Sequence, residues 1–317
     1  MSQAILEVRD LKKHFGAVRA VDGVSFAIDR GETLALVGES GCGKSTVGKA
    51  ALRLFDVTAG EVILDGTRIE AMGAGALRPL RRKIQVVFQD PFSSLNPRLR
   101  VRDILAEPIR NFGLANGADI EARIASLLDK VRLPREAAGR WPHEFSGGQR
   151  QRIGIARALA AEPDLIICDE AVSALDVSVK AQIVNLLQDL QKELGLALLF
   201  ISHDLAIVEH IAHRVAVMYL GRIVEIADKR VLFSTPQHPY TQALLSAVPV
   251  PDPTAISSRI ILQGDVPSPL APPPGCHFHT RCPYAFDRCR SDAPDLRDIG
   301  GAHRAACHLR QGPAETA

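Results

Sequence analysis

The sequence predicts an α/β protein with a mainly parallel sheet, followed by a smaller C-terminal extension. Two apolar runs, Leu165–Cys168 and Ala197–Ile201, have the length of buried strands, and the helical stretch Val179–Leu194 separates them. Strands that alternate with helices pair in parallel, because a parallel crossover needs a dozen or more residues. A chain of 317 residues exceeds one average domain, so we expect a large domain with an appendage.

The N-terminal part is expected to form short strands. Val24–Ile28 alternates between apolar and small or polar side chains, Asp29–Gly31 has the composition of a turn, and Thr33–Val37 is an apolar run that predicts a buried strand. Two further candidates are a hairpin at Glu61–Ile69 that turns on Asp65 and Gly66, and a buried strand at Ile84–Phe88. Residues 101–160 carry Ala, Leu, Arg and Glu at helical spacing and are expected to be mostly helical.

Composition and charge limit the functional classes to which the protein can belong. Hydrophobic residues make up 46% and charged residues 23%, which is ordinary for a soluble globular chain. The net charge of +2 is too mild to predict a nucleic-acid partner. The N-terminus lacks the apolar stretch of a signal peptide, and no run of 18 apolar residues occurs. If the protein serves a membrane, we expect it to do so from the cytoplasmic side through partner subunits.

The character of the sequence changes after about residue 235. Eight of the 20 prolines fall between Pro249 and Pro274, and four of the six cysteines fall in the last 42 residues. Proline at that density favours extended backbone over helix. We therefore predict one domain over residues 1–235 and a separate extension over residues 236–317.

A glycine-rich segment, Gly38–Ser45, fits the phosphate-loop pattern G-x4-G-K-[ST] between a strand and a helix. Glycines let successive backbone N–H groups face the phosphate oxygens, Lys44 can reach the β- and γ-phosphates, and the Ser45 hydroxyl can bind Mg²⁺. Cys42 is expected to contribute only its backbone N–H. The predicted ATP-binding residues here are Gly38, Glu39, Ser40, Gly41, Cys42, Gly43, Lys44, Ser45 and Thr46.

Two acidic residues end the apolar strand predicted at Leu165–Cys168. Asp169 comes at the strand end, where a carboxylate can join the Mg²⁺ shell beside the phosphates. Glu170 comes one residue later and can act as general base on the attacking water. Apolar runs before acidic residues are common, so Asp169 and Glu170 indicate these roles only because a phosphate loop lies upstream.

A second glycine-rich helix entry lies at Phe145–Gln149, before the helical run Arg150–Ala160. Ser146, Gly147, Gly148 and Gln149 offer N–H groups and a positive helix end to an anion. The alternative is a serine-capped helix with a flexible entry. One nucleotide does not ordinarily need two such helix ends in one chain.

The four cysteines of the extension are Cys276, Cys282, Cys289 and Cys307. Four thiols in a proline-rich segment with little core of its own suit a metal centre that stabilises the fold. Their spacing allows Zn²⁺, a [4Fe–4S] cluster or, least in keeping with the cytoplasm, two disulfides. The neighbouring histidines are expected to be surface residues; they are His277, His279, His303 and His308.

Taken in order, these motifs resemble the ATPase subunits of ABC transporters, over about residues 4–230. The resemblance includes Gln89, the segment Ser173–Asp176 and His203. It implies a RecA-like P-loop ATPase core with an antiparallel β subdomain and a helical subdomain at about residues 92–160. Phe145 stands where the family often has Leu, and Ala171 where it often has Pro; neither position supplies a reactive group.

The resemblance also implies roles for single residues. Phe15 would stack on adenine, Gln89 would contact Mg²⁺ and the water, and His203 would hold the γ-phosphate, so that Glu170, His203 and Gln89 form the catalytic set. Mg²⁺ would be held through Ser45, Gln89 and Asp169. Ser146–Gln149 would cap the ATP of the opposite subunit, and Asp176 would contact that subunit.

The extension resembles that of the ATPases of oligopeptide, dipeptide and nickel importers, in His238–Thr241, Ala247–Pro249 and Gly264–Pro269. It implies an F-type ATPase subunit that couples ATP hydrolysis to uptake of di- or oligopeptides, and a [4Fe–4S] cluster on the four cysteines with Zn²⁺ as the alternative. Nickel, glutathione or another peptide-like substrate, or a soluble ABC ATPase of repair or translation, are the other interpretations.

The same resemblance implies the partners. They are a second related ATPase subunit in a heterodimer, two transmembrane permease subunits and, indirectly, an external peptide-binding protein, with no nucleic acid. The expected location is peripheral, on the cytoplasmic face of the inner membrane of a bacterium.

Overall fold

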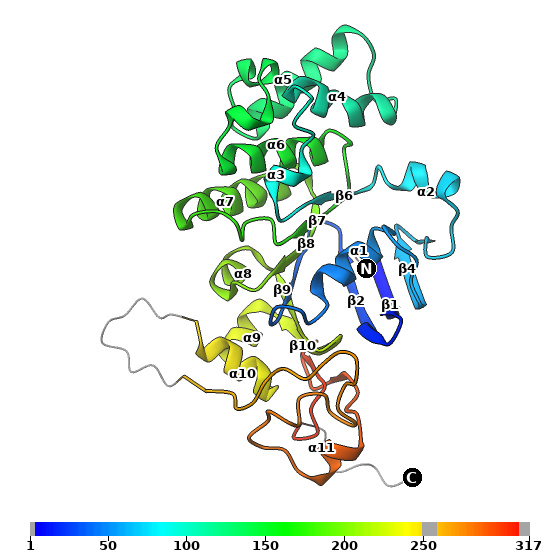
Figure 1. Ribbon diagram of the computed structural model, residues 1–317, viewed down its shortest axis with the longest axis vertical. Helices are drawn as coiled ribbons and strands as arrows, with labels where there is room; N and C mark the ends of the chain where they lie inside the picture. The colour runs from blue at the N-terminus through cyan, green and yellow to red at the C-terminus, as the bar shows by residue number, and fades with distance from the viewer. Residues whose placement is uncertain (1–3, 249–258, 311–317) are drawn as a thin grey trace. The chain divides into compact units, whose positions relative to one another are not determined.

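The computed structural model describes residues 4–248 and 259–310, and its helices and strands are labelled in Figure 1. These residues fall into two compact units. The helical unit contains residues 4–7, 27–33 and 63–201, and the phosphate-loop unit contains residues 8–26, 34–62 and 202–310. Among the described residues, no helix combines the length and apolar character needed to cross a bilayer.

The elements of the helical unit alternate between strands and helices. In chain order they are β5 (Thr67–Arg68), α2 (Ala74–Leu80), β6 (Ile84–Val87), α3 (Pro91–Ser94), α4 (Val101–Asn111), α5 (Ala118–Lys130), the 3₁₀ helices η1 (Arg135–Gly139) and η2 (Pro142–Glu144), α6 (Gly147–Leu159), β7 (Leu165–Asp169), α7 (Val177–Leu194) and β8 (Ala197–Ser202).

The phosphate-loop unit begins with longer strands and ends in the extension. Its elements are β1 (Ala4–Phe15), β2 (Val18–Asp29), β3 (Thr33–Val37), α1 (Lys44–Ala51), β4 (Ala59–Leu64), α8 (Leu205–Ile211), β9 (Arg214–Tyr219), β10 (Arg222–Asp228), α9 (Lys229–Ser234), α10 (Pro239–Ser246), α11 (Asp287–Ser291), β11 (Arg297–Asp298) and β12 (Arg304–Ala305), with the first residues of β1 and the ends of β2 and β4 in the helical unit.

The strands of the helical unit pair in parallel in the order β8-β7-β6. Every residue of β7 and β8 is buried, as the two apolar runs predicted. Strand β6 ends at Val87, one residue before the predicted end, and its two central residues are only half-buried because it pairs at one end of this order. Helices α4 and α5 pack on each other and on α6, so the predicted helical stretch is confirmed.

The strands of the phosphate-loop unit form a mixed arrangement. Strand β3, buried at all five residues, pairs in parallel with β9, whereas β10, β12 and β11 follow in antiparallel pairs. In a separate sheet of this unit, the strand order is β2-β1-β4. The predicted hairpin is confirmed: β4 and β5 are antiparallel, and Asp65 and Gly66 between them both have positive φ, as a type I′ turn requires.

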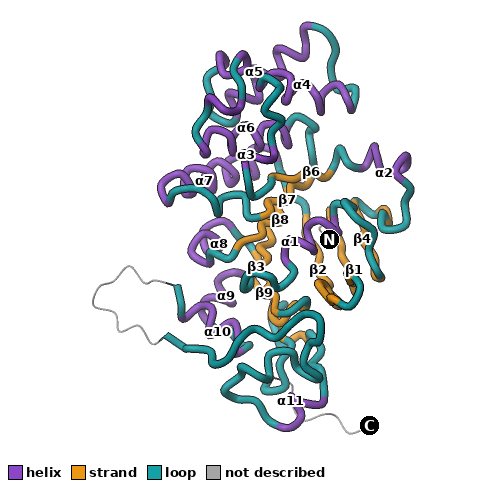
Figure 2. Tube along the Cα trace, in the orientation of Figure 1, coloured by secondary structure: helices purple, strands orange, loops and turns teal. Residues whose placement is uncertain are grey.

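The extension after α10 is mostly loop (Figure 2). Residues 249–258 of the proline-rich segment lie outside the described residues. Its remaining residues, 259–274, form neither helix nor strand, which agrees with their proline content. Strand β12 pairs with β10, so the extension adds strands to the sheet of the phosphate-loop unit. The domain division at residue 235 stays a prediction about sequence modules, because the two compact units follow other boundaries.

Candidate functional site

The phosphate loop, Gly38–Ser45, connects β3 to α1. Gly38 has φ 151° and Gly43 has φ 103°. A Cβ on Gly38 would lie 2.2 Å from the carbonyl oxygen of Met218, and one on Gly43 would lie 2.1 Å from that of Ala20. No side chain fits so close to rigid backbone, so both fixed glycines of the pattern have a steric cause in this chain.

Lys44 is the buried cation of the phosphate loop. It is 4% exposed and begins α1. Its Nζ donates to the carbonyl oxygens of Gly38 and Glu39, at 2.9 Å each. Ser45 and Thr46 follow in the first turn of the same helix and are half-buried. An ammonium group beside a helix N-terminus is an arrangement that attracts phosphate oxygens.

Two other residues of the phosphate loop, Cys42 and Glu39, have different surroundings. Burial raises the pKa of the Cys42 thiol, which therefore stays neutral, in line with a role limited to its backbone. Glu39 faces the extension: its N–H donates to Tyr240 Oη at 2.9 Å, and its carboxylate pairs with Arg281. Sequence reasoning missed both partners, because nothing in the local pattern marks contacts over such separations.

Phe15 and His203 also belong to the phosphate-loop unit. Phe15 ends β1 and is 48% exposed, with its ring edge-on to Phe55 at 5.5 Å between centroids. An exposed, supported ring suits stacking on a base. His203 is exposed and directly follows β8, one residue before Asp204, which caps α8 through the N–H of Ile207.

The acidic pair lies in the helical unit, where β7 ends. Asp169 is 7% exposed, and its register partner on β8 is Ile201. The N–H of Glu170 donates to the carbonyl oxygen of Ile201 at 3.1 Å. Glu170 has φ 50°, a left-handed conformation that non-glycine residues rarely adopt and that clusters at functional sites. The extended backbone of β7 therefore ends at Glu170.

Gln89 is exposed and follows β6 in the same unit. The carbonyl oxygen of the preceding residue, Phe88, accepts a hydrogen bond at 3.3 Å from Nε2 of Gln151, which is 1% exposed on α6. Gln151 thus ties the end of β6 to the helix that starts at the second glycine-rich segment. Sequence reasoning missed Gln151; its signal was a polar residue on the buried face of an amphipathic helix.

The second glycine-rich segment begins α6 with a reciprocal cap. The N–H of Gln149 donates to Ser146 Oγ at 3.3 Å, and the N–H of Ser146 donates to Gln149 Oε1 at 3.0 Å. Ser146 and Gln149 are nevertheless exposed, as is Asp176 at the start of α7. The cap leaves the N–H groups of Gly147 and Gly148 in the first turn, where an anion can bind.

The four cysteines of the extension line one small cavity, with His238 and Phe278 among its other walls. All four are free thiols, so the two-disulfide alternative is wrong. Burial raises the pKa of Cys276 to about 11 and also raises the pKa values of Cys282 and Cys307.

The metal expectation is not supported by this arrangement. Within residues 4–248 and 259–310, no group of three or more His, Cys, Asp or Glu side chains is placed to hold a metal ion. The fold gathers the thiols around one cavity, yet it does not set them at ligating positions for a [4Fe–4S] cluster or Zn²⁺.

Two of the neighbouring histidines correct the expectation of surface positions. His303 and His308 are 5% and 7% exposed. Nε2 of His303 lies 2.7 Å from the carboxylate of Glu225, which is fully buried and also accepts the backbone N–H of His238 at 2.9 Å. The imidazole therefore satisfies a buried carboxylate that sequence inspection did not single out.

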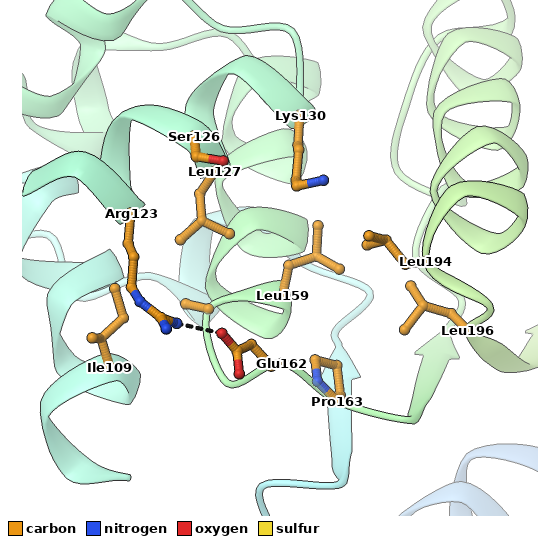
Figure 3. A pocket seen from close by; sticks show the side chains of 11 residues that line it. Ile109, Arg123, Ser126, Leu127, Lys130, Leu159, Glu162, Pro163, Leu194 and Leu196 are labelled. Carbon is orange, nitrogen blue, oxygen red and sulfur yellow. Dashed lines mark hydrogen bonds and ion pairs between the residues drawn. The ribbon is translucent and has the colours of Figure 1, made fainter. Parts of the chain in front are cut away.

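A surface pocket lies in the helical unit (Figure 3). Leu127, Leu159 and Leu194 contribute to its apolar wall, and Arg123 pairs with Glu162 beside it. None of the predicted site residues lines this pocket, so it is not the expected nucleotide site.

A phosphate loop, a strand ending in two acids and a second glycine-rich helix start define a nucleotide-binding ATPase of the cassette type. The ABC transporter family model matches residues 21–173, and the model of the oligopeptide/dipeptide transporter C-terminal region matches residues 224–289. A probable peptide ABC transporter ATP-binding protein of Sinorhizobium fredii is 55% identical, with 100% of this chain and 93% of the relative covered. The oligopeptide transport ATP-binding protein AppF of Bacillus subtilis is 50% identical, with 97% and 98% covered.

Solved structures agree with this assignment. The cbiO1 subunit from Clostridium perfringens, part of an ABC transporter complex, matches with a TM-score of 0.67 and 29% identity over 73% of this chain and 91% of its own. A dimeric ATP-binding cassette in a post-hydrolysis state with ADP and Pi matches with a TM-score of 0.65 and 29% identity over 71% of this chain and 99% of its own. The chain belongs to the ABC transporter family of ATP-binding proteins, and its fold is the ATPase cassette fold with mixed α/β sheets.

Proposed function

We propose that this chain is the ATP-hydrolysing subunit of a bacterial ABC importer and that it couples hydrolysis to uptake of di- or oligopeptides. The observation that carries the proposal is the match to peptide-transport relatives over nearly the whole chain, extension included. The steric need for glycine at Gly38 and Gly43 and the buried Lys44 support ATP binding at the phosphate loop.

The roles of the residues follow from their chemistry. Lys44 and the N–H groups of the phosphate loop neutralise charge on the phosphates, and the ring of Phe15 stacks on adenine. Ser45, Gln89 and Asp169 offer the hydroxyl, amide and carboxylate oxygens that would hold Mg²⁺, which would supply positive charge beside the phosphates.

The reaction itself needs a positioned water. Glu170 accepts a proton from the attacking water, and His203 donates a hydrogen bond to the γ-phosphate. The left-handed backbone of Glu170 supports this role, since such backbone conformations cluster at functional sites.

The proposed importer also contains partner subunits. Ser146–Gln149 cap the ATP of a second, related ATPase subunit, and Asp176 contacts that subunit; the exposure of Ser146, Gln149 and Asp176 supports an external partner. Two transmembrane permease subunits receive the motion, with Gln89 as their sensor, and an external peptide-binding protein supplies the substrate. The chain then lies at the cytoplasmic face of the inner membrane.

The cysteine group is proposed as a structural centre of the extension, with a [4Fe–4S] cluster preferred over Zn²⁺. Its support is the convergence of Cys276, Cys282, Cys289 and Cys307 on one cavity. Iron and acid-labile sulfide analysis of anaerobically purified protein decides: stoichiometric iron with sulfide supports the cluster, and zinc without sulfide refutes it.

The deciding experiment for the main proposal uses Glu170→Gln in the assembled complex. Removing the general base should lower the rate of ATP hydrolysis by about 10²- to 10⁴-fold and leave ATP binding intact. The measurements are phosphate release, ATP affinity and peptide uptake into membrane vesicles. Normal hydrolysis by the variant would remove Glu170 from its role, and ATP-driven uptake of no peptide by the wild type would refute the import proposal.

A further inference from the structure

Glu39 is held by two residues that lie far along the chain. Nη1 and Nη2 of Arg281 donate to its two carboxylate oxygens at 2.8 and 3.1 Å, and its own N–H donates to Tyr240 Oη at 2.9 Å. These partners are 242 and 201 residues away, both in the extension. Glu39 also offers its carbonyl oxygen to Lys44, so one residue links the extension to the cation of the phosphate loop.

The two extension residues are rigidly seated. Tyr240 is fully buried, and its ring packs against Tyr219 at 4.7 Å and against Phe278 at 5.4 Å between centroids. The side chain of Arg281 is only 8% exposed. Its backbone N–H donates to the carbonyl oxygen of Phe278 at 3.0 Å. A buried aromatic cluster therefore fixes both groups that hold Glu39.

The ion pair of Arg281 and Glu39 changes the electrostatics of the phosphate loop. A carboxylate in a loop that receives a triphosphate repels the ligand, and partial burial weakens the screening by water. A bidentate guanidinium cancels that charge and fixes the carboxylate in place. The hydrogen bonds to Glu39, together with its charge, in turn raise the pKa of Arg281, which stays protonated.

We propose that Arg281 and Tyr240 are positioning residues for ATP: they fix the phosphate loop through Glu39, and Arg281 cancels the Glu39 charge that would oppose the triphosphate. This inference rests on the proposed ATPase function. It gives the C-terminal extension a direct part in nucleotide binding. The extension then acts on the nucleotide site without touching the nucleotide.

The test is a double-mutant cycle on the full chain, read out as ATP affinity. Arg281→Met leaves Glu39 uncompensated and should weaken ATP binding by about tenfold or more. Glu39→Gln should weaken ATP binding less than Arg281→Met does, because it removes the hydrogen-bond partner and the repulsion together. Adding Glu39→Gln to Arg281→Met should then restore most of the affinity.

A merely structural role predicts the opposite result. If Arg281 serves only to hold the fold, the double variant binds ATP no better than Arg281→Met, and the inference is overturned. Arg288→Met is the matched control, since Arg288 pairs with Asp292 at the surface of the same extension, and it should leave the affinity unchanged. The loss in Arg281→Met should be larger for ATP than for ADP, and absent for adenosine.

Two further variants keep the test decisive if Arg281→Met does not fold. Arg281→Lys keeps the charge but loses the bidentate geometry, so it should weaken ATP binding by less than about tenfold, whereas a larger loss would contradict charge cancellation. Tyr240→Phe removes only the hydroxyl and should weaken binding by about threefold to tenfold. Failure of the wild type to bind ATP would refute the proposed function; normal wild-type binding with an unaffected Arg281→Met refutes only this inference.

Discussion

The phosphate loop and the segment Ser146–Gln149 are both glycine-rich entries to a helix, but the chain supports them differently. The phosphate loop is enclosed by its own unit: Lys44 is 4% exposed, and Glu39 is bound by Arg281 and Tyr240 from the extension. The segment at α6 has a local capping box, and both residues of that cap, Ser146 and Gln149, are exposed.

This difference distinguishes a site that one chain completes by itself from a surface that the chain presents to a partner. Groups that must bind a nucleotide in every state are best fixed by contacts within the chain, because a preformed site does not lose binding energy to ordering. Groups that act on a partner's nucleotide must stay accessible until the partner arrives. The enclosed loop and the open helix start are therefore consistent with the dimer proposed above, in which each chain would contribute one half of two sites.

The largest expected difference between the two segments comes from replacing one glycine in each of them, Gly43 and Gly147, by alanine. In Gly43→Ala the new Cβ meets the Ala20 carbonyl at 2.1 Å, so the loop must move; ATP affinity should fall on the order of 100-fold, in addition to backbone strain of about 1–3 kcal/mol. In Gly147→Ala the new Cβ meets Leu175 Cδ2 at 3.5 Å, an ordinary contact. ATP affinity and the thermal unfolding midpoint of each full chain are the measurements.

Gly147→Ala should keep both the stability, within about 0.5 kcal/mol, and the ATP affinity of the isolated chain. Its effect should appear as slower hydrolysis once the partner subunit is added, because the methyl group crowds the ATP held by the other chain. Equal losses of ATP affinity in the two variants would abolish the distinction between an enclosed and an open segment.

Local pattern predicted one set of features and missed another. The buried strands β3, β7 and β8, the turn at Asp65 and Gly66 and the phosphate loop were predictable, because each depends on residues within a few positions of one another. The contact of His303 with Glu225 spans 78 residues. No periodicity encodes such a partner, so that histidine was wrongly expected at the surface.

The extension shows the same limit in its cysteines. Their spacing suggested that they converge, and the fold brings all four to one cavity. Ligand geometry, however, depends on side-chain directions to within fractions of an ångström, which loop sequence does not determine. The spacing could therefore suggest a centre, but it could neither place the ligands nor choose the metal.

The smallest expected effect is a pH dependence of stability at His238, in the extension that holds the phosphate loop. His238 caps α10 by accepting the N–H of Tyr240 at Nδ1, at 3.1 Å, and burial lowers its pKa from 6.5 to about 3. Because the unfolded chain binds the proton more readily, this stability is full above pH 6.5 and is lost as the pH falls from 6.5 towards 3. Between pH 7.5 and pH 5 the loss amounts to about 2 kcal/mol.

His238→Asn tests this directly, since asparagine can also cap a helix but does not titrate. The variant should lose less stability than the wild type when the pH is lowered from 7.5 to 5, as measured by the shift of the thermal unfolding midpoint in each buffer. Other groups titrate equally in both chains, so the difference between the two shifts isolates His238. Identical shifts would mean that protonation of His238 does not loosen the helix that carries Tyr240, and that the phosphate loop is held independently of pH.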